Sequence, residues 1–244
     1  MTATVSPPAG AVARSDPQVR IRDYCEALEF YVGLPSDQFD RIVFADNSAS
    51  DLTPMYAAIA GRCRDKTIEL LSFQANDHSP TLGKAYGEFR LIDTALEHTQ
   101  LIGPQDLVWK TTGRLRCLNL GQLDRAIDRD VDMACDLHNV PFVGTGKMVG
   151  GEMMDLRLFA FRAQFYEQMI RGRWRAAGSG FDARFMYRVA VEAPACWRVQ
   201  PRFPRQPIIS GISGRTERDY LGPAQRMKDR FRDIMRRIAP RLWL

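Results

Sequence analysis

Two glycine-bearing segments of the sequence combine residue types that could bind an anionic ligand. Residues 82–88 place Lys84 between two glycines before a helical pattern, and backbone amides at a helix start beside an ammonium group can hold a phosphate or sugar oxygen. Residues 209–215 contain two Ser-Gly steps and an arginine, so their backbone could approach a ligand closely. Both patterns are also typical of ordinary loops, so neither assigns a function by itself.

Two further polar segments directly follow apolar, β-branched runs. Asp46-Asn47-Ser48 comes after the run at 41–45, and Lys110-Thr-Thr-Gly-Arg114 comes after the run at 107–109. Runs of this kind are typical of strands that end in polar loops. In a parallel sheet, ligands bind beyond the carboxyl ends of the strands, which is where both polar segments would lie.

The elements around these segments alternate between strand and helix. Helical spacing at 24–32 precedes strand patterns at 41–45 and 67–73, and helical spacing at 86–99 lies between the second of these and a third strand pattern at 107–109. This order predicts an α/β fold with a mixed, mostly parallel sheet flanked by helices. The patterns also predict strands near 131–137 and 158–161 and a helix within 180–197.

Charge is distributed unevenly along the chain. Of 34 basic and 29 acidic residues, 15 basic and 22 acidic ones precede residue 157, whereas 19 basic and 7 acidic ones follow Leu156. The net charge of +5 therefore hides a strongly basic second half. Such a half suggests an anionic partner, namely a phosphate-bearing substrate, a membrane surface or nucleic acid.

Composition excludes several classes of protein. No run approaches the roughly 18 apolar residues of a membrane-spanning helix, and residues 1–17 lack the apolar core of a signal peptide. We therefore expect a cytoplasmic protein. Five cysteines without a C-x-x-C pair indicate reduced thiols, and residues 1–16, rich in Ala, Pro, Ser and Thr, are expected to be a disordered tail.

The segment 223–244 has the pattern of an amphipathic, basic helix. Its apolar residues Met227, Phe231, Ile234, Met235 and Ile238 recur at helical spacing, with arginines and a lysine largely around the other side. One interpretation is a terminal helix that docks on the domain through the apolar stripe. The other is peripheral attachment to an anionic membrane, with a terminal Trp as part of the anchor.

Taken together, the strings DNSASDL, GKAYGE, KTTGR, DLRLFAFRAQFY and ISGISG resemble a bacterial family of capsule and lipopolysaccharide biosynthesis proteins. More broadly, the order of parts is similar to that of GT-A-fold glycosyltransferases with a family 2-like core. The resemblance spans roughly residues 20–220. It implies a GT-A-like fold and transfer of a sugar from a nucleotide diphosphate sugar to a cell-surface glycan or lipid-linked acceptor.

The resemblance implies donor-binding roles for nine residues. Asp46 matches the acid that contacts the nucleoside, since a carboxylate can accept hydrogen bonds from a base edge or ribose hydroxyls. Asp51 would help to shape that loop. The remaining donor-binding residues are Asn47, Ser48, Lys84, Gly87, Glu88, Lys110, Gly113 and Arg114.

The segment KTTGR departs from the general GT-A pattern, because it stands where a metal-binding Asp-x-Asp is usual. An arginine fork and a lysine can bind a diphosphate directly. We therefore expect that no cofactor beyond the donor is required and that the site holds no metal, although a divalent ion (Mn²⁺ or Mg²⁺) stays an alternative. The competing metal site is the triplet Asp128, Asp130 and Asp132, whose other interpretation is a solvated loop.

An inverting transfer needs a carboxylate base near the acceptor hydroxyl. The candidates are Asp155, Glu192 and Glu152. Asp155 stands two residues before Arg157, and a structural ion pair is the alternative interpretation. Glu192 ends an apolar helical stretch, where partial burial would raise its pKa.

The expected acceptor side comprises Arg157, Ser213, Gly214 and Arg215.

The predicted organisation has three parts. A tail covers residues 1–16, a GT-A-like domain covers 17–222, with a donor half up to about 156 and an acceptor half from 157, and the basic helix covers 223–244. Two alternatives stay open: a nucleotidyltransferase-like sugar-nucleotide enzyme, and a non-catalytic α/β protein that binds nucleic acid or another anion. Nucleic acid is the less favoured partner, since no known RNA- or DNA-binding pattern is present.

Overall fold

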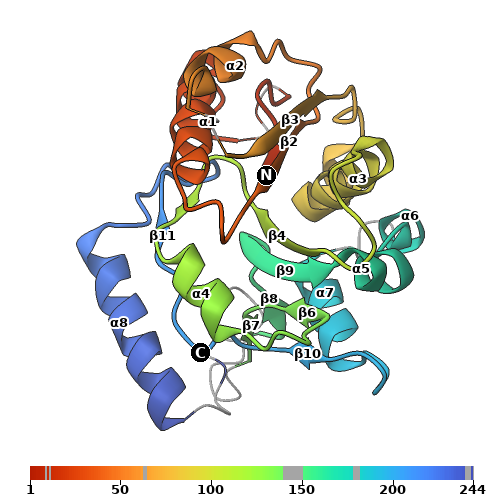
Figure 1. Cartoon of the computed structure of the whole chain (residues 1–244), viewed down its shortest axis with the longest axis vertical. Coiled ribbons are helices and arrows are strands. Elements are labelled where there is room, and N and C mark those ends of the chain that lie inside the picture. Colours follow the sequence, from red (N-terminus) through yellow and green to blue (C-terminus); the bar gives the residue numbers. More distant parts are fainter. Residues whose placement is uncertain are drawn as a thin grey trace.

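A computed structural model describes most of the 244-residue chain (Figure 1). The described residues are 1–8, 10, 12–62, 65–139, 151–177, 182–239 and 243, with the backbone alone for 80, 84, 176 and 177. Within these residues the fold is α/β, with mixed sheets flanked by helices.

Seven strands form one row through the middle of the molecule. β1 (Thr2–Ala3), β2 (Arg41–Asp46) and β3 (Thr67–Ser72) pair in parallel, in the order β1-β2-β3. The second group has the order β10-β6-β9-β4 and comprises β4 (Leu107–Thr111), β6 (Met133–Ala134), β9 (Leu158–Arg162) and β10 (Val199–Gln200). A parallel bridge from Thr2 to Thr112 joins β1 to the end of β4. In this row β9 alone runs antiparallel to its neighbours.

The first strand corrects the expectation of a disordered tail at 1–16. The Met1 amino group donates to the Val43 carbonyl at 2.7 Å, β1 pairs with Ala45 and Asp46, and Val5 is buried. Because β1 lies between β2 and β4, its backbone forms hydrogen bonds on both sides. Two residues are therefore enough to form a strand here, although the composition of the segment is typical of a loop. Asp16, the last residue of the supposed tail, caps the following helix by accepting from two of its first amides.

Helices cover both faces of the parallel strands (Figure 1). α1 (Pro17–Val32) packs on α2 (Thr53–Ile59) and on the side of β2 that presents Ile42 and Phe44. α3 (Gly83–His98) covers the other side, where Leu91 and Ala95 meet Ala45. Because successive side chains of β2 point to opposite faces of the sheet, they pack into two separate cores.

The second half of the chain builds an aromatic-rich core. α5 (Ala163–Met169), α6 (Arg173–Ala177) and α7 (Ala183–Val191) pack around β9, and Phe89 stacks on Phe159 and Tyr166. α7 is shorter than the predicted 180–197 helix, because Asp182 caps its start and Pro194 follows its end. The strand expected at 131–137 is divided into β6 and β7 (Leu137–His138), and β7 pairs with β8 (Met153–Met154).

Four further elements, two helices and two strands, lie around this row of strands. α4 (Leu120–Ala126) follows β5 (Arg116–Cys117), and β5 pairs antiparallel with β11 (Ile209–Ser210). α8 (Pro223–Ile238) lies along one side of the molecule (Figure 1); it begins where the predicted terminal helix 223–244 begins and ends at Ile238, and Trp243 forms a β-bridge with Asn139. None of the described helices is long and apolar enough to cross a membrane.

Candidate functional site

The order in which the chain adds strands to the sheet reverses next to β1. From β1 the chain builds β2 and then β3 on one side, and it next crosses to β4 on the other side of β1. In open α/β sheets such a switch point opens a crevice beyond the carboxyl ends of the strands, and ligands bind there. The predicted segments Asp46-Asn47-Ser48 and Lys110–Arg114 flank this point from β2 and β4.

The carboxylate of Asp46 is used entirely by the protein. It is fully buried and accepts from the Val5, Ser48 and Ser50 amides at 2.8, 3.0 and 3.2 Å. The hydroxyls of Ser48 and Ser72 also donate to it. Asp46 therefore ties the end of β1 to the loop after β2, and the predicted nucleoside contact has no free carboxylate oxygen in this structure.

The neighbouring Asn47 is left with an unused acceptor. Its side chain is 5% exposed, and its buried Oδ1 has no hydrogen-bond partner in the described part of the chain. Its backbone meanwhile pairs with Ala3 and Ala75. A buried polar atom without a partner costs free energy, so a ligand that donates a hydrogen bond to Oδ1 would be stabilised here.

Lys110 is buried instead of facing a ligand. Its ammonium group, 3% exposed, donates to Glu88 of α3, to the Leu156 carbonyl and more weakly to Thr112. Glu88 also accepts from the Thr2 hydroxyl. The predicted role of Lys110 in direct diphosphate binding is therefore not available in this geometry, and Lys110 with Glu88 fixes β1, α3 and β4 to one another.

Arg114 lies against the 209–214 loop, so the structure brings two predicted segments together. Its guanidinium donates to the Ile212 carbonyl at 2.9 Å and would collide with any side chain at Gly214. Its buried Nε has no hydrogen-bond partner among the described residues. Gly113 is needed because a Cβ there would lie 2.8 Å from the Thr2 carbonyl.

The segment 155–157 adjoins the end of β4. The Thr112 amide donates to the Arg157 carbonyl, and Asp155 holds the Arg157 guanidinium through three contacts of 2.5–3.1 Å. Arg157 also stacks on the ring of Tyr220, 4.9 Å from its centroid. Burial would raise the pKa of the Asp155 carboxyl, but Arg157 overcomes this effect and holds that pKa well below its usual range. A base works best with a pKa near the working pH, so this geometry favours the ion-pair interpretation of Asp155.

Two residues of this cluster were not predicted from the sequence. Tyr220 and Asp229 lie far from Arg157 in the sequence; the Tyr220 ring contacts Arg157, and the charge of Arg157 acts on Asp229. Partial burial raises the pKa of Asp229, although Gln225 and three arginines oppose this. Asp229 belongs to α8, and its helical pattern gave no signal of a site.

Several predicted residues lie apart from the cluster or have packing roles. Glu192 and Glu152 are exposed, which removes the partial burial expected for Glu192, and Arg215 is exposed as well. Ser213 is buried within its own turn. Gly87 gives space to the His78 ring. The side chain of Lys84 lies outside the described residues.

The aspartate triplet is a structural loop. Asp130 pairs with Arg198 at 2.7 Å, Asp132 accepts from the Arg198 amide and Asp128 from the Asp130 amide. Among the residues that the structure describes, no three His, Cys, Asp or Glu side chains gather as metal ligands. The solvated-loop interpretation of 128–132 thus agrees with the geometry.

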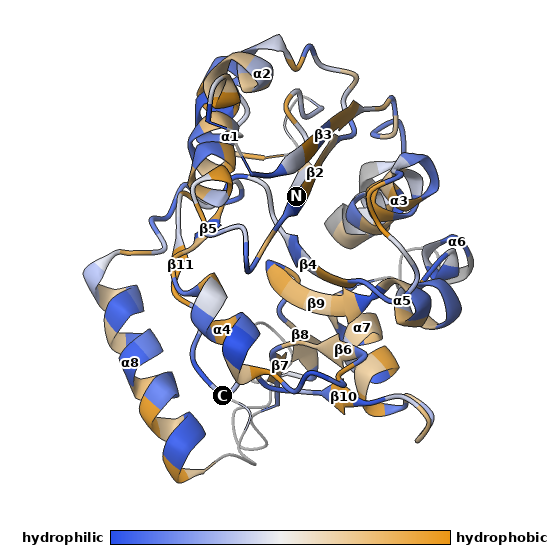
Figure 2. Ribbon diagram, in the orientation of Figure 1, coloured by the Kyte–Doolittle hydropathy of each residue, from blue (hydrophilic) through white to orange (hydrophobic). Residues whose placement is uncertain are grey.

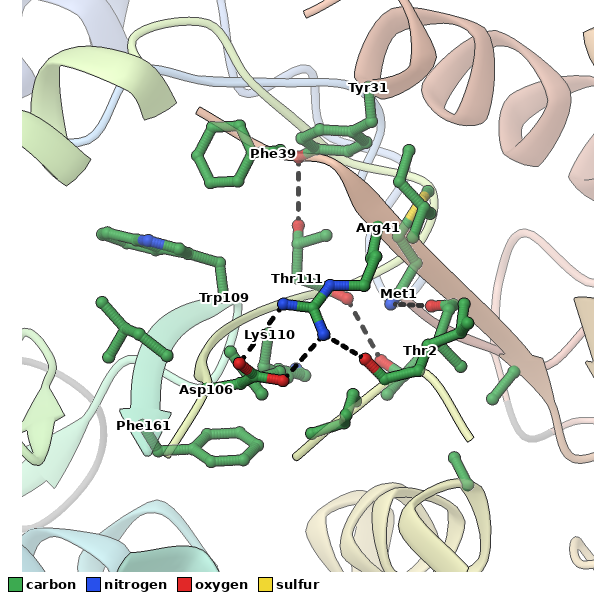
Figure 3. A pocket seen from close by; sticks show the side chains of 18 of the residues that line it. Met1, Thr2, Tyr31, Phe39, Arg41, Asp106, Trp109, Lys110, Thr111 and Phe161 are labelled. Carbon is green, nitrogen blue, oxygen red and sulfur yellow. Dashed lines mark hydrogen bonds and ion pairs between the residues drawn. The ribbon is translucent and has the colours of Figure 1, made fainter. Parts of the chain in front are cut away.

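A cavity of about 190 Å³ lies at the opposite edge of the sheet, toward the amino ends of β2 and β4. Because β1 pairs only with the end of β2, the first residues of β2 face β4 across this space. Its walls are mainly apolar, and the ion pair of Arg41 with Asp106 crosses it (Figure 3). The cavity reaches the polar cluster through Thr2, Lys110 and Thr111, which also line it.

No protein-family model matches the chain, and the search of curated proteins finds no relative. Among solved structures, the crystal structure of HddC from Yersinia pseudotuberculosis aligns with a TM-score of 0.41 and 11% identity. The alignment covers 90% of this chain and 86% of that one. A similarity of this size assigns neither a fold family nor a function.

Proposed function

We propose that this protein is a GT-A-like glycosyltransferase that moves a sugar from a nucleotide diphosphate sugar to a cell-surface glycan or lipid-linked acceptor at the cytoplasmic face of the membrane. The observation that carries the proposal is the meeting of three separate segments beside the switch point. Residues 155–157 and residues 209–214 each contact Lys110–Arg114 there. These segments are among those on which the resemblance to glycosyltransferases rests.

The unpartnered atoms favour a ligand with both donors and acceptors. Asn47 Oδ1 can accept from a hydroxyl or base amine, and Arg114 Nε can donate to a phosphate oxygen. They lie beyond the ends of β2 and β4, on either side of β1. A nucleoside diphosphate offers both kinds of group.

The carboxylates of this cluster are already occupied by protein groups, which favours a cationic side chain over a metal ion as the partner of the diphosphate. The Asp46 carboxylate is saturated by protein donors and that of Asp155 by Arg157. A divalent ion would have to displace these bonds, whereas a guanidinium can offset the charge that grows on the departing diphosphate. In this proposal Arg114 has that role, and Asp155 acts as a positioning residue for Arg157.

For an inverting transfer, Asp229 fits the base better than Asp155. Its half-buried carboxyl accepts from the Gln225 side chain at 2.9 Å, and burial raises its pKa, although Gln225 and the arginines Arg232, Arg157 and Arg236 oppose this. A base with a raised pKa accepts a proton from the acceptor hydroxyl more readily near neutral pH.

A thermal-shift panel tests the proposed function. UDP-, GDP-, CMP- and dTDP-sugars are each added with manganese or with EDTA, and we expect at least one to raise Tm equally in both. No shift with any donor, together with tight and salt-sensitive RNA binding, would overturn the proposal in favour of a nucleic-acid-binding protein. A shift that EDTA abolishes would overturn the metal-independent part.

A further inference from the structure

The helix α8 has its apolar face turned outward. Met227, Phe231, Ile234 and Ile238 are 70, 57, 52 and 74% exposed. Their spacing of four, three and four residues places them on one side of the helix. Figure 2 shows the resulting alternation of hydrophobic and hydrophilic bands along α8. Four large apolar side chains on one face form an exposed stripe of the kind that marks an interaction surface.

Polar contacts hold α8 to the body from the opposite side. Arg236 is buried and bonds to Asp136 at 2.5 Å, to Gln206 and to the Phe203 carbonyl. Asp233 also accepts from the Gln206 amide. The expectation that the helix docks through its apolar stripe is therefore wrong: polar pairs dock the helix, and of the five apolar residues predicted for the stripe only Met235 is half-buried, while the other four are exposed.

Exposed cations flank the stripe. At 100° per residue, Arg226, Arg230 and Arg237 fall on one flank and Lys228 on the other. All four side chains are exposed, and Arg237 has its ion-pair partner Asp233 within the same helix. An apolar stripe between rows of cations is the arrangement of helices that lie in a membrane interface.

We propose that α8 binds in the plane of an anionic lipid surface, with the apolar stripe inserted among the acyl chains and the flanking cations at the headgroups. Charge decides between this occupant and a second copy of the chain. Two such stripes pressed together would bring the arginine flanks of both helices close to each other, whereas anionic headgroups neutralise them. Trp243 does not belong to the anchor, since its ring packs against Tyr187 and its backbone carbonyl accepts from the Asn139 amide.

This inference stands independently of the proposed function. Where both hold, α8, which Arg236 and Asp233 fix to the body, would keep the polar cluster beside the bilayer that presents a lipid-linked acceptor.

Vesicle flotation tests the inference with the full-length chain. We expect binding to phosphatidylglycerol-containing vesicles, weak binding to pure phosphatidylcholine and release by high salt. The double variant F231S/I234S should bind more than about tenfold more weakly. The triple variant R226Q/R230Q/R237Q should lose roughly fivefold per charge at low salt.

The matched control is Y56S/V191S, which removes two apolar side chains of comparable exposure (55 and 45%) far from α8 in the sequence. It should bind vesicles like the parent protein. Equal binding by F231S/I234S, no preference for anionic lipid, or no binding at all by the parent would overturn the inference. Light scattering that shows a dimer of the parent protein and a monomer of F231S/I234S would also overturn the inference, because a second copy of the chain would then cover the stripe. Far-UV circular dichroism and an unchanged nucleotide-sugar thermal shift show that the variant is folded and separate this test from that of the proposed function.

Discussion

Replacing Arg236 with alanine should destabilise the protein strongly, because this side chain joins α8 to the body. Its guanidinium is 2% exposed and donates to Asp136, to Gln206 and to the Phe203 carbonyl. The substitution leaves the Asp136 carboxylate, 4% exposed, without its cation. Removing one partner of a buried pair costs about 3–5 kcal/mol. That is a large fraction of the roughly 5–15 kcal/mol of a typical domain.

Urea unfolding followed by circular dichroism measures the change in the free energy of unfolding. The control is Arg237→Ala at the adjacent position, where a 73% exposed side chain pairs with Asp233 and the expected cost is below about 1 kcal/mol. The double variant D136L/R236M replaces both charges with apolar groups and should be much more stable than R236A. The reasoning is refuted if R236A costs no more than R237A, or if D136L/R236M is as unstable as R236A.

Three further predictions follow from other buried groups. Asp93→Ala should cost at least about 3 kcal/mol in urea unfolding, since the Tyr166 hydroxyl, the Trp174 indole and a backbone amide lose their acceptor; a cost below about 1 kcal/mol would contradict this. Because burial raises the pKa of Cys117 to about 12 and also raises that of Cys135, iodoacetamide with peptide mapping should label exposed Cys196 in the native protein and the other two only after unfolding. Arg157 lowers the pKa of Asp155, so the stabilisation relative to Asp155→Asn should be constant from pH 8 to 5 and fall below about pH 4; a decline between pH 7 and 5 would contradict the ion pair.

The sequence predicted the elements with strong local periodicity. β2, β3, α3 and β4 match their patterns because each has an apolar side that meets a core. β1 was missed because two residues leave almost no pattern, and its position depends on ladder bonds from β2 and β4.

The sequence indicated where the polar segments of the candidate site lie in the fold, but not which partners their side chains bind. Polar segments at strand ends indicated the edge of the sheet where Lys110–Arg114 and residues 155–157 meet. The role of each side chain depends on a partner far away in the sequence. Lys110 donates to Glu88, Asp46 accepts from the Val5 amide, and Arg236 donates to Asp136. These pairings span 22 to 100 residues, so no local pattern could show that Lys110 is buried or that the stripe of α8 faces solvent.

Isothermal titration of the nucleoside diphosphate sugar that gives the largest thermal shift is the decisive test of a donor site at Arg114. The titration is made in EDTA with the parent protein, R114A and the control R62A, which removes an exposed cation that pairs with Glu29 outside the cluster. We expect one site in the parent protein, a loss of about 1.5–3 kcal/mol of binding free energy in R114A, and little change in R62A. Equal affinity of R114A and the parent protein, with both folded, would contradict the assignment of the donor site to the end of β4.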